Sequence, residues 1–227
     1  SADGEYIAFG SDSETVYLFS KDSSTPLWSY ATDDDVYSVD ISADGEYIVA
    51  GSGWSDKKVY LFGKDSSTPL WTYTTEGSVG CVAISADGKY IVVGSRDDAI
   101  YFFDRENSTP LWSYDVSDSY EEFYDRDDLS ISVEGYVTAV VSNKLYLFGK
   151  ESNTTLWSSS LNPGRAAISE DGNYIIAGGP DNHIYLYERG NSTPLWGYQA
   201  ENSVSSLSIS ADGGYVVAGS YDDKVYM

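Results

Sequence analysis

A short motif that returns at a nearly constant interval is the feature that most constrains the fold of this chain. Ser-Ala-Asp-Gly, or a close variant of it, begins at Ser1, Ser42, Ser85, Ser132, Ser169 and Ser210. The successive intervals are 41, 43, 47, 37 and 41 residues. A period of this length is typical of proteins built from repeated supersecondary units. The 227 residues therefore correspond to about five and a half units of this kind.

Each unit contains four short runs of β-branched and aromatic residues, which we call A, B, C and D. In the second unit these runs cover residues 36–41, 46–52, 58–62 and 70–73, separated by Asp-Gly, Ser and Pro turn signals. Their length and spacing are those of β-strands. Runs B and C are almost continuously apolar, which indicates strands that are covered on both faces. Each unit is thus predicted to be a four-stranded antiparallel sheet packed between two neighbours.

Such sheets, repeated about every 41 residues, predict an all-β fold, namely a β-propeller of four-stranded antiparallel blades. We expect a single propeller domain over residues 1–227, with units starting near residues 1, 42, 85, 132, 169 and 210. Helical patterns are nearly absent. The one exception is Ser119-Tyr120-Glu121-Glu122, a capping-box pattern that predicts a single helical turn.

The strand count is uneven, because the chain begins just before a B run and ends within a C run at Met227. We count five A, six B, six C and five D runs, so the first unit lacks its inner strand and the last its outer strand. One interpretation is a six-bladed ring with incomplete first and last blades. The favoured one is a fragment of a seven- or eight-bladed propeller. Exposed strand edges at the incomplete blades also predict pairing with another copy, that is, self-association.

Two repeat families resemble these units. Runs A to C, with the pattern Val-x-x-Val-x-Ile-Ser-Ala-Asp-Gly-x-Tyr-Ile-Val-x-Gly-Ser, resemble a Trp-Asp (WD-type) repeat. Runs C and D, with Val-Tyr-Leu-Phe-x-Lys-x-x-x-Thr-Pro-Leu-Trp-x-Tyr, resemble the pyrroloquinoline-quinone-type propeller repeat. The Gly-His of the first pattern is missing, and prolines stand near the usual Gly of the second. The near-identity of the units is similar to that of tandem propellers in archaeal or bacterial surface proteins.

Five tryptophans recur in register with the repeat, each directly after a Leu. They are Trp28, Trp71, Trp112, Trp157 and Trp196. In the quinone-type repeat this Trp docks between neighbouring blades, so the resemblance implies the same structural role here. A buried Trp removes about 150–250 Å² of surface from water, which makes packing the better explanation than ligand contact.

The irregular positions lie in the loops between runs B and C and between runs D and A. Propeller topology places these two loop types on one face, and irregular loops on a rigid scaffold are where binding usually occurs. Trp54 stands in a B–C loop that is two residues longer than most others, as a partner anchor or a packed cap. Residues 115–128 form an acidic insertion that contains Tyr120, Phe123 and Tyr124. We take these four aromatic residues as candidate partner-binding residues.

The same insertion offers carboxylates for a cation. Asp125, Asp127 and Asp128 are candidates for Ca²⁺, although the Asp-x-Asp-x-Asp-Gly spacing of a dedicated loop does not occur. Beyond this calcium option no cofactor is predicted. Asn107, Asn153 and Asn191 begin Asn-x-Thr sequons in equivalent C–D loops and are candidate glycosylation sites.

Composition excludes several classes of function. There are 13 Lys and Arg against 36 Asp and Glu, a net charge of −23, which disfavours nucleic acid as a partner. No apolar stretch long enough to insert into a membrane occurs. One Cys and one His exclude a disulfide within the chain and any motif that needs two histidines. His183 lies in a loop beside a strand, without a Gly-x-Ser-x-Gly elbow in the chain.

These observations predict a non-catalytic propeller scaffold that binds a protein or cell-envelope partner through the face of the B–C and D–A loops. Acidity and glycosylatable turns favour an extracellular or cell-surface location. The alternative is a fragment of a quinoprotein-type dehydrogenase, which would need a cation on the axis and bases near the quinone. High acidity is also compatible with adaptation to high salt.

Overall fold

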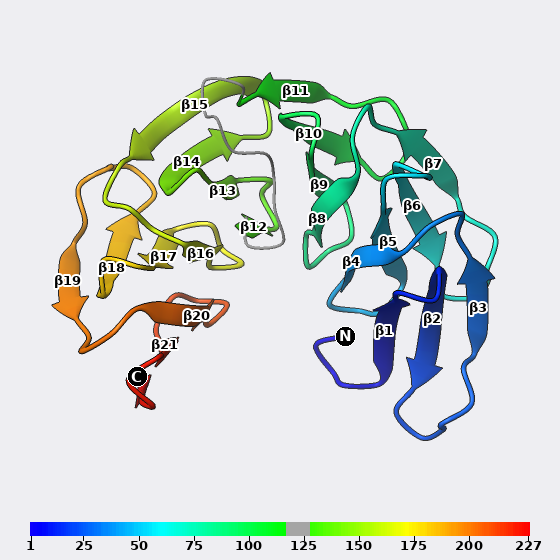
Figure 1. Ribbon diagram of the computed structural model, residues 1–227, viewed down its shortest axis with the longest axis horizontal. Helices are drawn as coiled ribbons and strands as arrows, with labels where there is room; N and C mark the ends of the chain where they lie inside the picture. The colour runs from blue at the N-terminus through cyan, green and yellow to red at the C-terminus, as the bar shows by residue number, and fades with distance from the viewer. Residues whose placement is uncertain (117–127) are drawn as a thin grey trace. The chain divides into compact units, whose positions relative to one another are not determined.

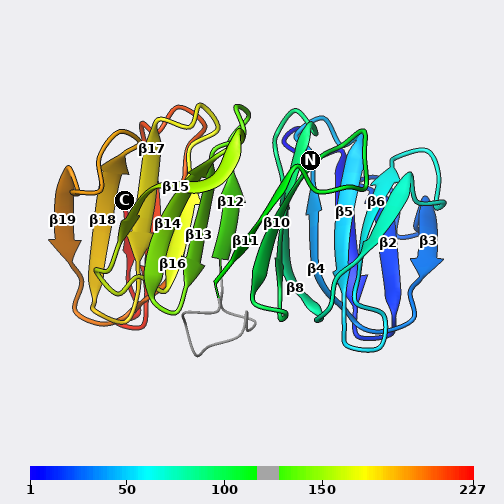
Figure 2. The same ribbon diagram turned by 90° about the horizontal axis from the view of Figure 1, so that it is seen from above.

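The computed structural model describes residues 1–116 and 128–227, which form six antiparallel sheets of three or four strands (Figures 1 and 2). No helix occurs in these two ranges, and the helical turn expected at residues 119–122 lies outside them. The all-β prediction and the propeller architecture are confirmed. The chain divides into two compact units, with the first three sheets in one and the last three in the other.

Unit 1 contains blades 1 to 3. The strands of blade 1 are β1 (Tyr6–Ser11), β2 (Thr15–Ser20) and β3 (Trp28–Ala31). Those of blade 2 are β4 (Val36–Ile41), β5 (Tyr47–Ser52), β6 (Lys58–Gly63) and β7 (Trp71–Thr74). Those of blade 3 are β8 (Val79–Ile84), β9 (Tyr90–Ser95), β10 (Ala99–Asp104) and β11 (Trp112–Asp115).

Unit 2 contains blades 4 to 6. The strands of blade 4 are β12 (Asp128–Ile131), β13 (Val137–Val141), β14 (Lys144–Gly149) and β15 (Ser152–Ser159). Those of blade 5 are β16 (Arg165–Ile168), β17 (Tyr174–Gly178), β18 (His183–Glu188) and β19 (Trp196–Gln199). Those of blade 6 are β20 (Val204–Ile209), β21 (Val216–Ser220) and β22 (Val225–Tyr226).

Every sheet is a simple meander in which consecutive strands are neighbours, so runs A to D become its strands in order. Within each unit the sheets pack face to face, and the A strands of successive blades lie side by side, as Figure 1 shows for β4 and β8. Side chains of one A strand also bond the next. Ser38 Oγ accepts from the Val82 N–H at 3.1 Å, and Asp40 Oδ2 accepts from the Ile84 N–H at 2.9 Å.

The Ser-Ala-Asp-Gly motif forms a self-contained turn between strands A and B. In blade 2, Ser42 Oγ donates to Asp44 Oδ1 at 2.6 Å and accepts from the Tyr47 N–H at 3.0 Å. The Gly45 N–H donates to the Ser42 carbonyl at 2.9 Å, with a left-handed φ of 72° that favours glycine. Each motif residue therefore has a bond or a dihedral angle to satisfy, which explains why this turn is so uniform.

The glycine of this turn has a second role between blades. A Cβ on Gly88 would lie 2.6 Å from Cδ2 of Tyr47 in the preceding blade, and one on Gly45 equally close to Tyr6. In these blades the tyrosine two positions after the turn glycine thus packs on the next turn. The repeat therefore encodes contacts between blades as well as strands within them.

The core lies between the sheets of each unit. Its buried side chains are aliphatic and aromatic residues of strands B and C together with residues of the neighbouring A strand. In unit 1 they include Val16, Leu18, Ile48, Tyr60 and Phe62 between blades 1 and 2, and Val59, Leu61, Val79, Ile91 and Phe103 between blades 2 and 3. In unit 2 they include Leu145, Leu147, Ile168, Ile175 and Tyr187 between blades 4 and 5.

Three of the in-register tryptophans contact the next blade in the same way. The Trp71 ring lies 5.4 Å from that of Phe103, and its Nε1–H donates to the Arg105 carbonyl at 2.6 Å. Trp28 does the same with Phe62 and the Lys64 carbonyl, and Trp157 with Tyr187 and the Arg189 carbonyl. Each indole thus has both an aromatic neighbour and an acceptor for its N–H.

Candidate functional site: the loop face of unit 1

The B–C and D–A loops meet at one end of the sheets. The Gly53 N–H donates to the Asp35 carbonyl at 2.9 Å, and the Glu76 N–H donates to Asp97 Oδ2 at 2.8 Å. In each pair one residue belongs to a B–C loop and the other to the D–A loop beside it. We call residues 12–14, 32–35, 53–57, 75–78 and 96–98 the loop face of unit 1. In unit 2 the Tyr221 N–H donates likewise to the Ser203 carbonyl at 3.0 Å.

A recurring Asp–Tyr pair braces the B–C loops. Tyr101 Oη donates to Asp97 Oδ2 at 2.9 Å, and the same bond joins Tyr60 to Asp56, Tyr185 to Asp181 and Tyr226 to Asp222. Burial, and then the bond to Asp181, raises the pKa of Tyr185 to about 12. These loop carboxylates therefore have structural partners.

Asp56 is the most deeply placed of these carboxylates. Its side chain is fully buried, and Oδ1 lies 2.6 Å from Lys58 Nζ. Burial alone would raise the pKa of Asp56, but the hydrogen bonds from Lys58 and Tyr60 outweigh it and hold that pKa below its usual value. The ionised carboxylate thus fixes the loop that carries Trp54.

Trp54 stands exposed on this fixed loop. Its side chain retains 47% of its accessible surface. Next to it, the Ser55 N–H donates to Asp34 Oδ2 at 2.6 Å, and this bond, followed by that of the Asp35 N–H, lowers the pKa of Asp34. A Cβ on Gly53 would lie 2.8 Å from the Asp34 carboxylate, so a larger residue there would displace that carboxylate.

Arg96 covers part of the Trp54 ring from the next blade. Its guanidinium carbon lies 5.7 Å from the Trp54 ring centroid and 5.5 Å from that of Tyr37. Both distances are within the range of a cation–π interaction. The Arg96 N–H donates to the Ser78 carbonyl at 2.9 Å, which fixes the backbone that carries the guanidinium.

A polar pocket of about 530 Å³ lies beside these rings, and we call it the loop-face pocket. It is lined by Asp12, Asp35, Val36, Tyr37, Gly80 and Arg96. Tyr37 and Gly80 are the extra residues where the register of β4 against β5 and of β8 against β9 shifts by one. Such bulges re-aim a side chain out of the regular pleat, and Tyr37 is accordingly 37% exposed.

Several predicted site residues lie outside the described part of the chain. They are Tyr120, Phe123, Tyr124, Asp125 and Asp127, together with the side chain of Asp128. The partner-binding and calcium predictions for them stay predictions. Within residues 1–116 and 128–227, no group of three or more His, Cys, Asp or Glu side chains is placed to hold a metal ion.

The three predicted glycosylation residues are exposed. Asn107 Oδ1 accepts from the Thr109 N–H at 2.8 Å, and Asn191 Oδ1 accepts from the Thr193 N–H at 2.9 Å. Asn153 lies within strand β15 and so differs from the two turn residues. Use of these sequons stays a prediction.

His183 is the first residue of β18, whereas the sequence suggested a loop position. Its ring stacks on Tyr185 at 5.4 Å, and Nδ1 lies 2.8 Å from the Asp181 carbonyl. The imidazole therefore belongs to the Asp–Tyr brace of blade 5.

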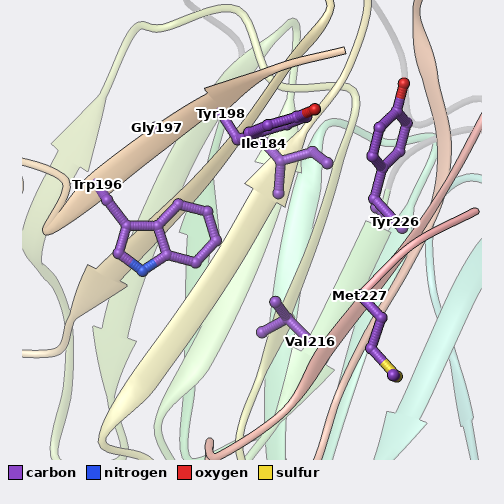
Figure 3. A pocket seen from close by; sticks show the side chains of 8 residues that line it. Ile184, Trp196, Gly197, Tyr198, Val216, Tyr226 and Met227 are labelled. Carbon is purple, nitrogen blue, oxygen red and sulfur yellow. The ribbon is translucent and has the colours of Figure 1, made fainter.

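The other two in-register tryptophans are Trp112 and Trp196. Trp112 stacks on Phe102 of its own sheet, with ring centroids 4.9 Å apart. Trp196 is 41% exposed and lines an apolar pocket of about 540 Å³ with Tyr198, Val216, Tyr226 and Met227 (Figure 3). We assign no function to this pocket.

Tyr37, Arg96, Asp12 and Asp35 are the functional candidates that the sequence did not reveal. A bulge that re-aims Tyr37 has no sequence signature in this repeat, and Arg96 looks like one more base in a turn. The one available signal was that Arg96 has no basic counterpart at the equivalent position of the other repeats, where Asp12, Gly53, Asn143, Pro180 and Tyr221 stand.

The six meander sheets and the repeated tryptophan contacts define a β-propeller of the quinone-type and WD-type repeat class. The chain belongs to the family described as outer membrane protein assembly factor BamB, whose model matches residues 1–196. The model described as WD domain, G-beta repeat, matches residues 192–227. No curated protein matches the chain. The predicted resemblance to both repeat types is therefore confirmed.

One further observation concerns membranes. Among the described residues there is no helix that is long and apolar enough to cross a bilayer.

Proposed function

We propose that this chain is a non-catalytic propeller module that binds a protein or cell-envelope partner through the loop face of unit 1. The observation that carries the proposal is Trp54, a large aromatic side chain left 47% exposed on a loop that hydrogen bonds hold in place. Rigid aromatic anchors beside an arginine are the usual centres of binding energy in protein interfaces.

The surroundings of Trp54 support this role. The three tryptophans Trp28, Trp71 and Trp157 place their indole N–H groups on carbonyls of the next blade. Trp54 instead stands outside the repeat register, next to Arg96, Tyr37 and the loop-face pocket. A packed cap would bury its ring, whereas a partner anchor leaves it open to solvent.

The family match agrees with a binding role. The family is named for an outer membrane protein assembly factor, and an assembly factor acts on other proteins. The comparisons do not favour a quinoprotein-type dehydrogenase over a binding module. An extracellular or cell-surface location is part of the proposal, supported by the net charge of −23 and the exposed sequons.

Site-specific photo-crosslinking tests the proposal. A benzoylphenylalanine is placed at position 54 and, as the matched control, at Asp65, whose side chain is 91% exposed in a C–D turn. Each variant is produced in the source organism and irradiated, and the adducts are identified by mass spectrometry. We expect a discrete adduct from position 54 that position 65 does not form. Identical adducts from both positions, or none from position 54, would contradict the proposal.

A further inference from the structure

We propose that the loop-face pocket receives a lysine or arginine side chain from a basic segment of the partner protein. This inference rests on the proposed function and names the chemistry of the partner at the same surface. It is carried by Asp12, Asp35, Tyr37 and Arg96, which line one hollow, and by the Trp54 ring next to the Arg96 guanidinium.

Asp12 and Asp35 line this hollow. Most other loop-face acids have internal partners: Asp34 accepts from Ser55, Asp56 pairs with Lys58 and Asp97 with Tyr101. In the described part of the chain no hydrogen bond or ion pair is found for the Asp12 and Asp35 side chains. They are therefore available to a cation that enters the pocket, for which a charge-assisted hydrogen bond is the strongest kind of contact.

The aromatic rings favour the same ligand. Arg96 already holds its guanidinium over Tyr37 and Trp54, which shows that cations fit against the faces of these rings. The bulge in β4 aims Tyr37 at the pocket. A volume of about 530 Å³ is within the usual size of ligand pockets, so an extended basic side chain can enter.

The net charge of the loop face favours a cation over an anion as its ligand. The loop-face residues include nine acids and two bases, a net charge of 2 − 9 = −7. The acids are Asp12, Glu14, Asp33, Asp34, Asp35, Asp56, Glu76, Asp97 and Asp98, and the bases are Lys57 and Arg96. A negative face attracts a basic partner and speeds its association, while a neutral saccharide would gain nothing from it.

Calorimetric titration with hepta-lysine tests this inference on the intact protein. The site variant is D12N/D35N, and the matched control is D22N/D65N, which removes the same charge from two exposed C–D turn residues. We expect the site variant to bind at least about tenfold more weakly than wild type and the control to stay within about twofold, because local pairing adds to the general attraction. Wild-type affinity should also fall as salt is raised.

A third variant, R96Q, is expected to change the affinity for hepta-lysine in the opposite direction. Removing the resident cation should strengthen hepta-lysine binding, because Arg96 repels a second cation at this site. Equal losses in the two double variants, or weaker binding of hepta-lysine by R96Q, would overturn the inference. So would saturable binding of hepta-glutamate or of a neutral oligosaccharide in place of hepta-lysine. A specific adduct at position 54 together with any of these results would leave the proposed function standing.

Discussion

At the scale of single residues, Trp71 and Trp54 differ in how far the fold buries them. Trp71 is partly buried, with its indole N–H on the Arg105 carbonyl and its ring beside Phe103. Trp54 has no place in the repeat register and keeps nearly half of its surface exposed. The same side chain thus contributes to stability in one position and is open to a partner in the other.

Substitution distinguishes the two positions. W71A should lower the free energy of unfolding by roughly 3–5 kcal/mol, because it removes a packed aromatic side chain and leaves a cavity. W54A, the matched control at an exposed position, should change it by no more than about 0.5 kcal/mol. Urea denaturation followed by circular dichroism measures both. Equal losses in the two variants would contradict this assignment.

The Asp–Tyr brace predicts that the stability of the fold decreases at alkaline pH. Because the folded-state pKa of Tyr185 is raised to about 12, above the usual value of about 10, its contribution to stability is complete below pH 10. It is lost as the pH rises from about 10 to 12, since only the unfolded state releases the proton in that window. In an ultraviolet titration of the phenolates, the difference between wild type and Y185F should be a single tyrosine that ionises near pH 12.

The variant D181N provides the control for that titration. It removes the negative charge of the group that accepts from the Tyr185 hydroxyl, while leaving the side chain nearly the same size. The late phenolate transition should move toward pH 10 but not reach it, because burial is the larger cause of the raised pKa. A transition that stays unchanged would show that the brace has no role in the titration.

At the scale of elements, the A–B turn depends both on its own backbone conformation and on its contact with the neighbouring blade. Gly4 and Gly88 occupy the same turn position with φ of 71° and 67°. A Cβ on Gly4 would meet nothing within 4 Å, whereas one on Gly88 would lie 2.6 Å from Tyr47. The two positions therefore differ only in the contact with the neighbouring blade.

Alanine substitutions at Gly4 and Gly88 therefore form a matched pair. G4A should cost about 1–2 kcal/mol of stability from the left-handed backbone alone. G88A should cost that amount and about 1–3 kcal/mol more, because the added methyl overpacks the tyrosine. Thermal unfolding by calorimetry gives both values. If G4A were as destabilising as G88A, the turn would act through its backbone only.

At the element scale, a Lys or Arg that recurs after strand C makes a second contact between blades. Arg105 places its guanidinium carbon 4.3 Å from the Tyr47 ring centroid while its carbonyl accepts the Trp71 N–H. Arg189 does the same for Tyr136 and Trp157. Bases stand two residues after the aromatic end of strand C in five repeats, at Lys21, Lys64, Arg105, Lys150 and Arg189. The residue thus links the tyrosine and the tryptophan of the preceding blade.

At the scale of the whole molecule, the net charge of −23 acts on stability. Like charges repel more strongly in the compact state, and salt screens this repulsion. The melting temperature should therefore rise as sodium chloride is increased from about 0.01 M to about 1 M. Differential scanning calorimetry measures it. A melting temperature that falls over this range would mean that attractive ion pairs dominate.

Much of the fold could be predicted because the same pattern of strands and turns occurs several times in the sequence. Strand order and the A–B turn follow from patterns that recur in every repeat. The uneven strand count follows from counting those patterns along the chain. The loop-face pocket could not be predicted, since it joins Asp12, Tyr37 and Arg96 from three different blades. Its geometry depends on bulges and on the approach of the D–A loop to the B–C loops, which no single repeat encodes. The Asp–Tyr braces were not predicted from the sequence.

The central claim is that one surface of this propeller module, the loop face around Trp54, makes the contact with a partner. The indole ¹H–¹⁵N spectrum tests it most directly, recorded with and without the protein captured by crosslinking at position 54. The account predicts that the Trp54 signal shifts while those of Trp28, Trp71 and Trp157, whose indoles are bonded inside the fold, stay in place. Shifts at these three with an unchanged Trp54 would contradict it.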